Sequence, residues 1–126
     1  MEFTVSTDTR LEAVDITDRV ESAVAARERN APTATVFVEH TTAGVVVNEA
    51  EPRLLDDVEA FLSELVPDEG WRHDELDGNA DSHLRTLVLG ASETVPVKDG
   101  EMALGRWQSM LLVECDGPRE RTVRVV

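Results

Sequence analysis

Apolar and polar residues follow one another in the two-residue rhythm of β-strands along much of the chain. The stretches EFTVST (2–7) and LEAVDI (11–16) mix the two kinds of residue in near alternation. Because successive side chains of a strand point to opposite faces, both stretches are expected to be half-buried strands. The stretch TATVFVE (33–39) is β-branched and aromatic with apolar residues on both faces, which predicts a covered strand. A further strand, GVVVNE (44–49), is expected beyond the corner HTTA (40–43).

Two stretches change to the helical period. A helix is expected over 18–30, where Asp18 and Glu21 have the arrangement of a capping box. The clearest helix is expected over 52–66, with Pro52 in its first turn. Its apolar side chains form one stripe that should face the core: Leu54, Leu55, Val58, Phe61, Leu62 and Leu65.

The segment 67–80 is expected to be a loop, and its length indicates a functional role. After it, DSHLRTLVLG (81–90) predicts a short helix that turns Leu84, Leu87 and Val88 inward and stops at its final glycine.

The last third of the chain predicts an antiparallel meander. SETVPVK (92–98) and EMALGRWQ (101–108) flank the dipeptide DG at 99–100, which is a strong hairpin signal. SMLLVEC (109–115) is an apolar strand that should turn at DGP into RTVRVV (121–126). Strands packed against a few helices define the α+β class.

The length of the sequence fits a single domain spanning 1–126, and a chain of this size can form a stable core without disulfide bonds or structural metals. Cys115 is the only cysteine, so no disulfide can form within the chain. No stretch approaches the ~20 apolar residues of a membrane span, and the N-terminal residues do not resemble a signal peptide. The sequence therefore predicts a soluble, cytoplasmic protein without a membrane partner.

The charge of the chain is strongly acidic. It carries 26 acidic and 12 basic residues, a net charge of −14, and Lys98 is its only lysine. The acidic residues are spread over every segment, which we interpret as adaptation of the surface to high salt. The alternative is a field that attracts cations. Either interpretation makes nucleic acid an unexpected partner.

The three histidines are the main candidates for chemistry. His83 falls in the first turn of the helix expected over 81–90, where the helix dipole favours a neutral ring. His73 precedes two carboxylates that can orient an imidazole, and His40 ends an apolar strand. Three imidazoles and a water satisfy a catalytic zinc. The same spacing also fits a solvated loop residue, a helix-end residue and a satisfied strand-end residue.

Other polar and aromatic side chains extend this candidate set. Thr41 and Thr42 offer hydroxyl groups to an anionic oxygen, or they cap a turn. Trp107 lies on an expected strand, where it either packs in the core or covers a ring-shaped ligand. Glu114 interrupts an apolar strand, so it lies either at an exposed end or buried with a partner, as a candidate acid or base.

The ordered motifs HTTA, NE, HDE, SHL, PVKDG and LGRWQ, with the acidic stretch LLDDVEAFL, resemble the YjbQ-like family. Members of that family are described as secondary thiamine-phosphate synthases. The resemblance extends from Glu39 to Glu114 and accounts for all three histidines. The chain departs from the family at Asp81-Ser82, because many relatives have a proline shortly before the histidine.

The resemblance implies an antiparallel β-sheet sandwich with about three helices, which assembles as a homotrimer with its site near a subunit boundary. It also implies a pocket in which His40, His73 and His83 bind a divalent metal, zinc or, with a diphosphate substrate, magnesium. Seven further residues match the family's pattern and are candidates for the site: Thr41, Asn48, Glu49, Asn79, Gly105, Trp107 and Gln108.

Three functions stay open. The first is an enzyme that joins a pyrimidine diphosphate to a thiazole phosphate, with Thr41 and Thr42 on the phosphates and Trp107 near the cationic carbon. No Gly-rich phosphate-binding loop is present to support this reading.

The second function is a metal-dependent hydrolase or lyase that acts on a small phosphorylated metabolite. His40 and His83 would then be catalytic, and Glu49 or Glu114 would move protons around a bound water. The third is a non-catalytic trimer that binds a ligand.

Overall fold

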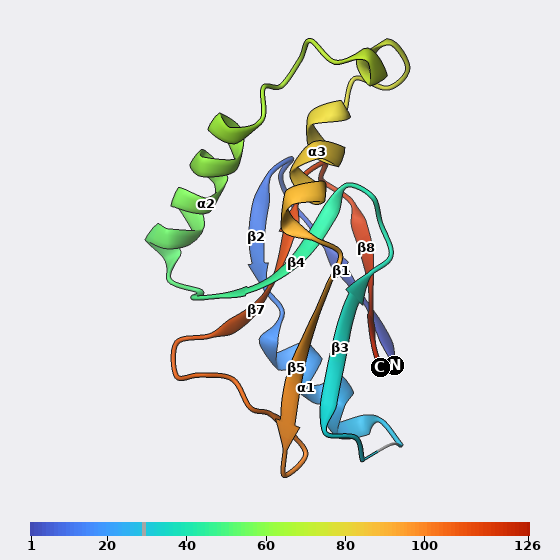
Figure 1. Ribbon diagram of the computed structural model, residues 1–126, viewed down its shortest axis with the longest axis vertical. Coiled ribbons are helices and arrows are strands. Elements are labelled where there is room, and N and C mark those ends of the chain that lie inside the picture. The colour runs from blue at the N-terminus through green and yellow to red at the C-terminus, as the bar shows by residue number, and fades with distance from the viewer. Residues whose placement is uncertain (29) are drawn as a thin grey trace.

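The computed structural model describes residues 1–28 and 30–126, and this part of the chain forms two antiparallel sheets with four helical segments (Figure 1). The strands are β1 (Glu2–Ser6), β2 (Glu12–Asp15), β3 (Thr33–Val38), β4 (Ala43–Asn48), β5 (Ser92–Lys98), β6 (Glu101–Met102), β7 (Ser109–Glu114) and β8 (Glu120–Val125). The helices are α1 (Thr17–Ala26), α2 (Pro52–Leu65), α3 (Ala80–Leu89) and the short 3-10 helix η1 (Arg72–Glu75). The α+β class is confirmed. None of the described helices has the length and apolar character needed to span a membrane.

The strands divide between a five-stranded sheet, in the order β1-β8-β3-β5-β6, and a three-stranded sheet, β2-β7-β4. The expected hairpin joins β5 to β6, and its central residues Asp99 and Gly100 have φ of 54° and 81°. Positive φ at both positions is what a type I′ turn requires. The expected meander is wrong, because β6 ends at Met102 and the chain crosses to the other sheet, where β7 pairs with β2 and β4.

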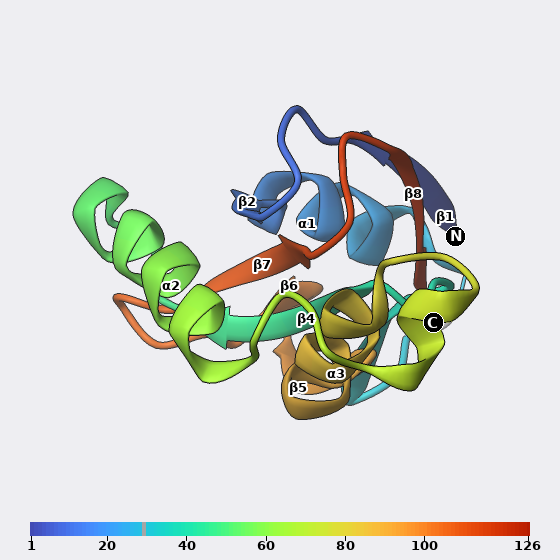
Figure 2. The same cartoon turned by 90° about the horizontal axis from the view of Figure 1, so that it is seen from above.

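The main core lies between the two sheets and α1, and Figure 2 shows these elements from above. Val20 of α1, Val36 of β3 and Leu112 of β7 are fully buried in it. A second cluster around Leu62 and Val113 lies on the other face of β7, beneath α2 and α3. Apolar groups therefore cover β7 on both faces, which accounts for its continuous apolar sequence.

Helix α1 is shorter than the helix expected over 18–30, and residue 29 lies outside the described residues. The expected capping box is wrong. The helix begins at Thr17 without a side-chain cap, and the Glu21 carboxylate instead accepts a hydrogen bond from the backbone N–H of Met102 at 3.1 Å. Glu21 thereby joins α1 to β6.

The apolar stripe of α2 is only partly buried. Leu62 alone is fully covered, whereas Phe61 is 59% and Leu65 45% exposed. The stripe was expected to face the core along its whole width. Because α2 lies on the outer side of the three-stranded sheet, one edge of the stripe packs and the other faces solvent (Figures 1 and 2).

Helix α3 is rotated relative to the expectation. Leu87 is 77% and Val88 65% exposed, so these two residues do not point inward. The buried positions are instead Ala80, Asp81, Ser82, Arg85 and Thr86.

A buried ion network explains this rotation. The Asp81 carboxylate accepts two hydrogen bonds of 2.9 Å from the guanidinium of Arg10 and a further one from Arg85. Arg85 also donates to the carbonyls of Leu62 and Val66, each at 2.8 Å, and so caps the C-terminus of α2. Asp81 and Arg85 are 1% exposed or less, and charges buried this deeply must be paired. Pairing them fixes which face of α3 turns inward.

Gly44 sets how closely α3 can approach β4. A Cβ atom at this position would lie 2.7 Å from the carbonyl oxygen of Gly90 and 2.8 Å from Cβ of Leu89.

We expect Gly44→Ala to lower the free energy of unfolding by about 1–3 kcal/mol, because the added methyl overpacks the contact. Urea denaturation measures this change. The control is Gly105→Ala, whose new methyl meets only the flexible end of Gln108; an equal loss in both variants would contradict the close-packing account.

Candidate functional site

A cavity of about 830 Å³, which we call the histidine pocket, opens where β3, α3 and the start of β8 meet. Its wall contains residues Phe37 to Thr42, Asp77, Asn79, His83, Ala91, Asp116, Arg119 and Arg121. Five of the residues predicted for a site therefore share one volume: His40, Thr41, Thr42, Asn79 and His83. A separate hollow of about 540 Å³ near the two chain ends contains none of the predicted site residues.

His40 is held as a neutral ring with a known tautomer. Its Nε2 accepts a hydrogen bond of 3.0 Å from the backbone N–H of Thr122. A backbone N–H can only donate, so the ring proton must lie on Nδ1. Burial lowers the pKa of His40, and the positive charge of Arg121 lowers it further. His40 can thus offer one N–H donor to a ligand.

His73 belongs to a chain of hydrogen bonds that also contains Asn79, Asp116 and Arg119. The amide Nδ2 of Asn79 donates to the Asp116 carboxylate at 3.0 Å, which leaves its Oδ1 to face Nε2 of His73 at 3.1 Å. Because an amide oxygen accepts, Nε2 of His73 carries a proton. Arg119 donates to the same Asp116 carboxylate at 3.0 Å.

His83 lies next to His73. The centroids of the two rings are 4.9 Å apart and the rings are nearly perpendicular, at 85°. Among the described residues no side chain or backbone group hydrogen-bonds to the His83 ring, which is half-buried in the pocket wall. Asp74 supports this arrangement, because its carboxylate accepts from the N–H groups of both Trp71 and Ala80 and so joins η1 to the start of α3.

Glu114 lies behind the pocket, buried with a partner. It is 0% and Arg121 2% exposed, and Arg121 donates to both oxygens of the carboxylate. Thr7 Oγ1 donates to the same carboxylate at 2.7 Å and the N–H of Asp116 at 2.9 Å. Burial raises the pKa of Glu114, but these hydrogen bonds outweigh it, so the pKa is lowered overall. A carboxylate held ionised and fully bonded is poorly suited to accept a proton.

Arg121 also shapes the corner that follows His40. Its guanidinium donates to the carbonyl oxygen and the hydroxyl of Thr42, at 3.1 and 2.8 Å. Thr41, by contrast, is exposed at the mouth of the pocket, and its hydroxyl has no hydrogen-bond partner among the described residues. Thr42 is therefore committed to the fold, while Thr41 is accessible to a ligand.

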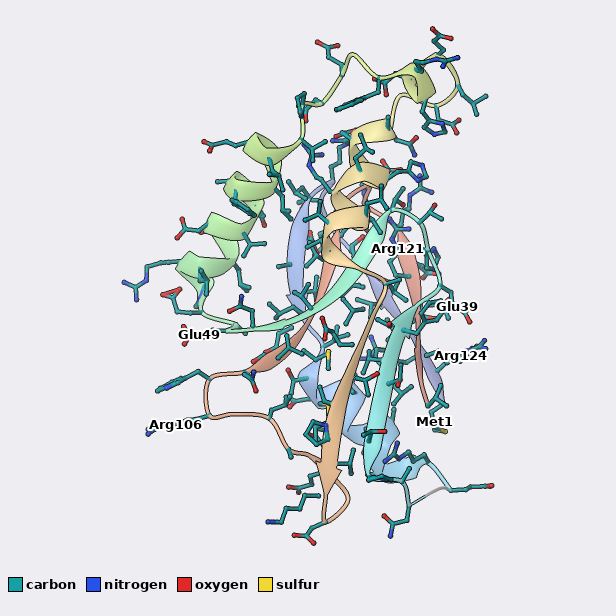
Figure 3. All side chains as sticks on the ribbon, viewed as in Figure 1. Met1, Glu39, Glu49, Arg106, Arg121 and Arg124 are labelled. Carbon is teal, nitrogen blue, oxygen red and sulfur yellow. The ribbon has the colours of Figure 1, made fainter. Side chains whose placement is uncertain are left out.

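The remaining candidates lie at the other end of β4. Glu49 and Trp107 line a smaller hollow of about 330 Å³, together with Arg106 and Ser109. Asn48 ends β4, whose six residues span roughly 20 Å at about 3.3 Å each. Figure 3 shows Glu49 and Arg106 well apart from Arg121 and Glu39.

Gly105 and Gln108 belong to the same distant segment, where the Gly105 N–H donates to the Gln108 side chain at 2.8 Å. Trp107 lies on a loop and is 66% exposed, so the expected strand and core position are wrong. Within one chain, the candidates thus form two separate groups.

The comparisons with known proteins agree with this fold. A family model described as "UPF0047 protein YjbQ-like" matches residues 1–126. The chain belongs to this family. A UPF0047 protein of Archaeoglobus fulgidus is 48% identical over 99% of this chain and 98% of its own length. The UPF0047 protein YugU of Bacillus subtilis is 35% identical, over 94% and 90% respectively.

Solved structures of similar proteins share the architecture. A hypothetical protein of Aeropyrum pernix K1 superimposes with a TM-score of 0.95 at 45% identity, covering 100% of this chain and 95% of that one. A protein of Sulfolobus solfataricus, described as YbjQ-like and of unknown function, has a TM-score of 0.95 at 39% identity, covering 99% and 92%. The sandwich fold expected from the resemblance is therefore confirmed.

Sequence reasoning missed three polar residues of this UPF0047 pocket: Asp116, Arg119 and Arg121. A usable signal existed for one of them. Arg121 is in phase with Val123 and Val125, the inward positions of β8, so an arginine there indicates a buried charge that needs a carboxylate.

The metal site implied by the family resemblance requires the three histidines to offer free ring nitrogens to one point. His40 cannot ligate through Nε2 while that atom accepts the Thr122 N–H, and Nε2 of His73 faces Asn79. Among residues 1–28 and 30–126, no group of three His, Cys, Asp or Glu side chains is placed to hold a metal ion. The three-histidine set does not fit a metal within one chain as arranged here, and zinc or magnesium binding stays a prediction.

The depressed pKa values of Glu114 and Asp81 make stability dependent on acid pH. In the unfolded chain these groups take up protons near their usual values of 4.5 and 3.8, whereas in the folded protein they resist protonation. The stabilisation is thus complete above about pH 5 and lost as pH falls through the folded-state pKa values. We expect urea unfolding to show this loss below pH 5.

In Glu114→Gln the free energy of unfolding should fall by about 3–5 kcal/mol at pH 7, because Arg121 is left buried without a counter-charge. The free energy of unfolding of this variant should also change less with pH below 5, because one titrating carboxylate is absent. Glu101→Gln, at an exposed position, is the control and should change neither quantity. A variant with Glu114→Gln that kept the full acid sensitivity would contradict this assignment.

Proposed function

We propose that this UPF0047 protein is an enzyme that acts on a small phosphorylated metabolite in the histidine pocket. The observation that supports it is the meeting of His40, Thr41, His83 and Arg119 around one cavity. Three of these groups offer N–H or O–H donors to an anion, and the fourth, His83, is a ring that makes no hydrogen bond with the described residues. Donors for a phosphate beside a free acid–base group are the minimum for phosphoryl or diphosphate chemistry.

The roles of the pocket residues follow from their bonds. Nδ1–H of His40 and the hydroxyl of Thr41 donate to phosphate oxygens, and Arg119 adds a positive charge at the rim, where its side chain is 53% exposed. His83 transfers a proton at the reacting centre. His73 and Asn79 hold the wall beside His83, and Asp116 fixes the orientation of the Asn79 amide.

The specific reaction in this proposal is the one implied by the family resemblance, the joining of a pyrimidine diphosphate to a thiazole phosphate. The thiazole nitrogen forms a bond to the methylene carbon of the pyrimidine while the bond from that carbon to the diphosphate oxygen breaks. Pyrophosphate leaves with the electron pair, and His83, which has first taken up a proton from solvent, transfers that proton to it. The proposal also includes the cytoplasmic location and the homotrimer that the sequence analysis predicts.

Two histidine variants separate binding from chemistry. We expect His83→Ala to lower the rate of thiamine phosphate formation by about 10²–10⁴-fold, because it removes the proton-transfer group. It should still bind inorganic pyrophosphate. His40→Ala should instead weaken pyrophosphate binding, measured by calorimetry, by about tenfold for one lost hydrogen bond. Thr94→Ala, on the outer face of β5, is the control for both assays.

The wild-type protein decides between the enzyme and the non-catalytic alternative. Purified protein is incubated with both precursors and magnesium or zinc, and thiamine phosphate is separated and quantified. Pyrophosphate binding without any product would contradict the thiamine-phosphate reaction. If phosphate esters also stayed intact, the remaining function would be ligand binding alone.

The second candidate, a metal-dependent hydrolase or lyase, requires the close pair of His73 and His83 to gain further ligands, because the described residues of one chain supply no third His, Cys, Asp or Glu in place. Oδ2 of Asp77 lies 3.8 Å from Nε2 of His73. Elemental analysis of protein purified without a histidine tag should find a transition metal at close to one ion per chain, and His83→Ala should lose it. Protein without any transition metal would remove this candidate.

A further inference from the structure

The dipeptide Asp-Gly occurs three times in the chain, at 77–78, 99–100 and 116–117. An aspartate in front of a glycine can react with its own main chain, because glycine has no Cβ atom to block the approach of its nitrogen to the aspartate side chain. The reaction requires a free carboxyl group, an accessible glycine nitrogen and freedom to rotate about the bonds between them. The structure gives the three dipeptides different access to this reaction.

Asp77 and Gly78 meet all three requirements. They lie in the turn between η1 and α3, which projects beyond the sheets at one end of the molecule (Figure 1). The Asp77 side chain is 59% exposed, and its carboxylate accepts no hydrogen bond among the described residues. Neither the N–H of Gly78 nor that of Asn79 has a hydrogen-bond partner in the part of the chain that the structure describes. A Cβ atom built on Gly78 would meet no atom within 4 Å, so the Gly78 nitrogen can approach Cγ of Asp77 without breaking a contact.

Asp116 and Gly117 are held in place on both sides of the bond that joins them. The Asp116 carboxylate accepts hydrogen bonds from Asn79 and Arg119, each at 3.0 Å. The N–H of Gly117 donates to the carbonyl of Arg10 at 3.1 Å. All three hydrogen bonds must break before the nitrogen can reach the side chain.

Asp99 and Gly100 are held by the hairpin that they form. They are its two central residues, and the β5–β6 pairing closes on both sides of them, with Lys98 opposite Glu101. Rotation about the bonds of Asp99 opens this turn. The hairpin therefore hinders the reaction, although the Asp99 side chain itself is exposed.

We propose that Asp77–Gly78 is a site of spontaneous aspartate isomerisation. The Gly78 nitrogen forms a bond to Cγ of Asp77, and the hydroxyl of the protonated carboxyl group leaves as water with the amide proton. Water then adds to the five-membered ring. Attack at Cγ restores aspartate, whereas attack at the main-chain carbonyl carbon breaks its bond to the Gly78 nitrogen and leaves isoaspartate. Water is the only reactant that the cycle needs.

The product lengthens the main chain in the wall of the histidine pocket. In isoaspartate the chain runs through Cβ and Cγ, which inserts one atom between two segments that are joined by side-chain hydrogen bonds. His73 bonds to Asn79 at 3.1 Å, and the Asp74 carboxylate accepts from the N–H of Ala80 at 3.3 Å. Both bonds cross the point of insertion, so isomerisation of Asp77 should weaken them.

The site is tested in the full chain, incubated for several weeks at neutral pH. A protease that cleaves after arginine alone places the three dipeptides on separate peptides, 73–85, 86–106 and 107–119. Electron-transfer fragmentation distinguishes aspartate from isoaspartate in each peptide. We expect isoaspartate in 73–85 to exceed that in 107–119 by at least about tenfold, because three hydrogen bonds protect the latter, with 86–106 between them.

The same incubation in urea is the control for sequence effects. Unfolding removes the hydrogen bonds, so the three peptides should then contain similar amounts of isoaspartate. Native protein without isoaspartate in 73–85, or with more of it in another of the three peptides, would overturn the proposal. A ratio between peptides that is the same with and without urea would also overturn it, because the structure would then have no part in the selectivity.

Asp77→Glu is the matched variant for the structural consequence. It keeps an exposed carboxylate, but ring closure would need a six-membered ring, which forms far more slowly. Amide hydrogen exchange at Ala80 should become roughly fivefold faster in isomerised wild type, because one hydrogen bond is lost, and should stay unchanged in the aged variant. Isoaspartate at 77 with full protection at Ala80 contradicts the weakening of the pocket wall.

Isomerisation should also lower the rate of product formation, because His73 lies beside His83, and this step rests on the proposed function. The two proposals fail separately. Isoaspartate at 77 in a protein that forms no product supports the modification site and contradicts only the proposed function. Product formed by a protein that accumulates no isoaspartate at 77 contradicts the modification site and leaves the proposed function in place.

Discussion

The buried ion pair between Glu114 and Arg121 is the constraint on which the pocket depends. Glu114 lies on β7 of the three-stranded sheet and Arg121 on β8 of the five-stranded sheet, so the pair fastens the two layers at one end. Burying two charges is costly unless every polar atom finds a partner, and Thr7, Thr42 and the Asp116 N–H supply the missing bonds. The same guanidinium that neutralises Glu114 positions the corner after His40, and burial together with this positive charge lowers the pKa of that histidine.

A second buried network, around Asp81 and Arg85, sets the other wall. By turning their own side of α3 inward, these charges leave His83 at the pocket and Leu87 in solvent. The rotation of α3 therefore determines both that His83 borders the pocket and that Leu87 is exposed. Arg10 contributes from the start of the chain, which makes the orientation of α3 a property of the whole fold and not of the helix alone.

The sequence predicts the features that depend on neighbouring residues. The hairpin at 99–100 could be predicted because a type I′ turn needs only two residues that tolerate positive φ. The rotation of α3 could not be predicted from neighbouring residues, because the partner of Asp81 is Arg10, 71 residues earlier. Apolar periodicity alone favoured Leu87 and Val88 as the buried side. The prediction that Trp107 lies on a strand was wrong for a related reason. The strand-like pattern of the sequence continues past Met102, but the chain leaves the five-stranded sheet at that residue.

The predicted site was likewise found in part. His40 and His83 meet because the end of β3 and the start of α3 border the same cavity. Glu49 does not join them, because a strand separates the two ends of the motif HTTAGVVVNE, however close they are in sequence. The strong negative charge of the chain also affects the binding of an anionic ligand. It opposes an anionic ligand at low ionic strength, but at 1 M salt charges beyond about 3 Å are screened. In concentrated salt, donors such as those of His40, Thr41 and Arg119 act without that long-range penalty. An acidic surface is thus compatible with an anion-binding pocket when the recognition is short-range.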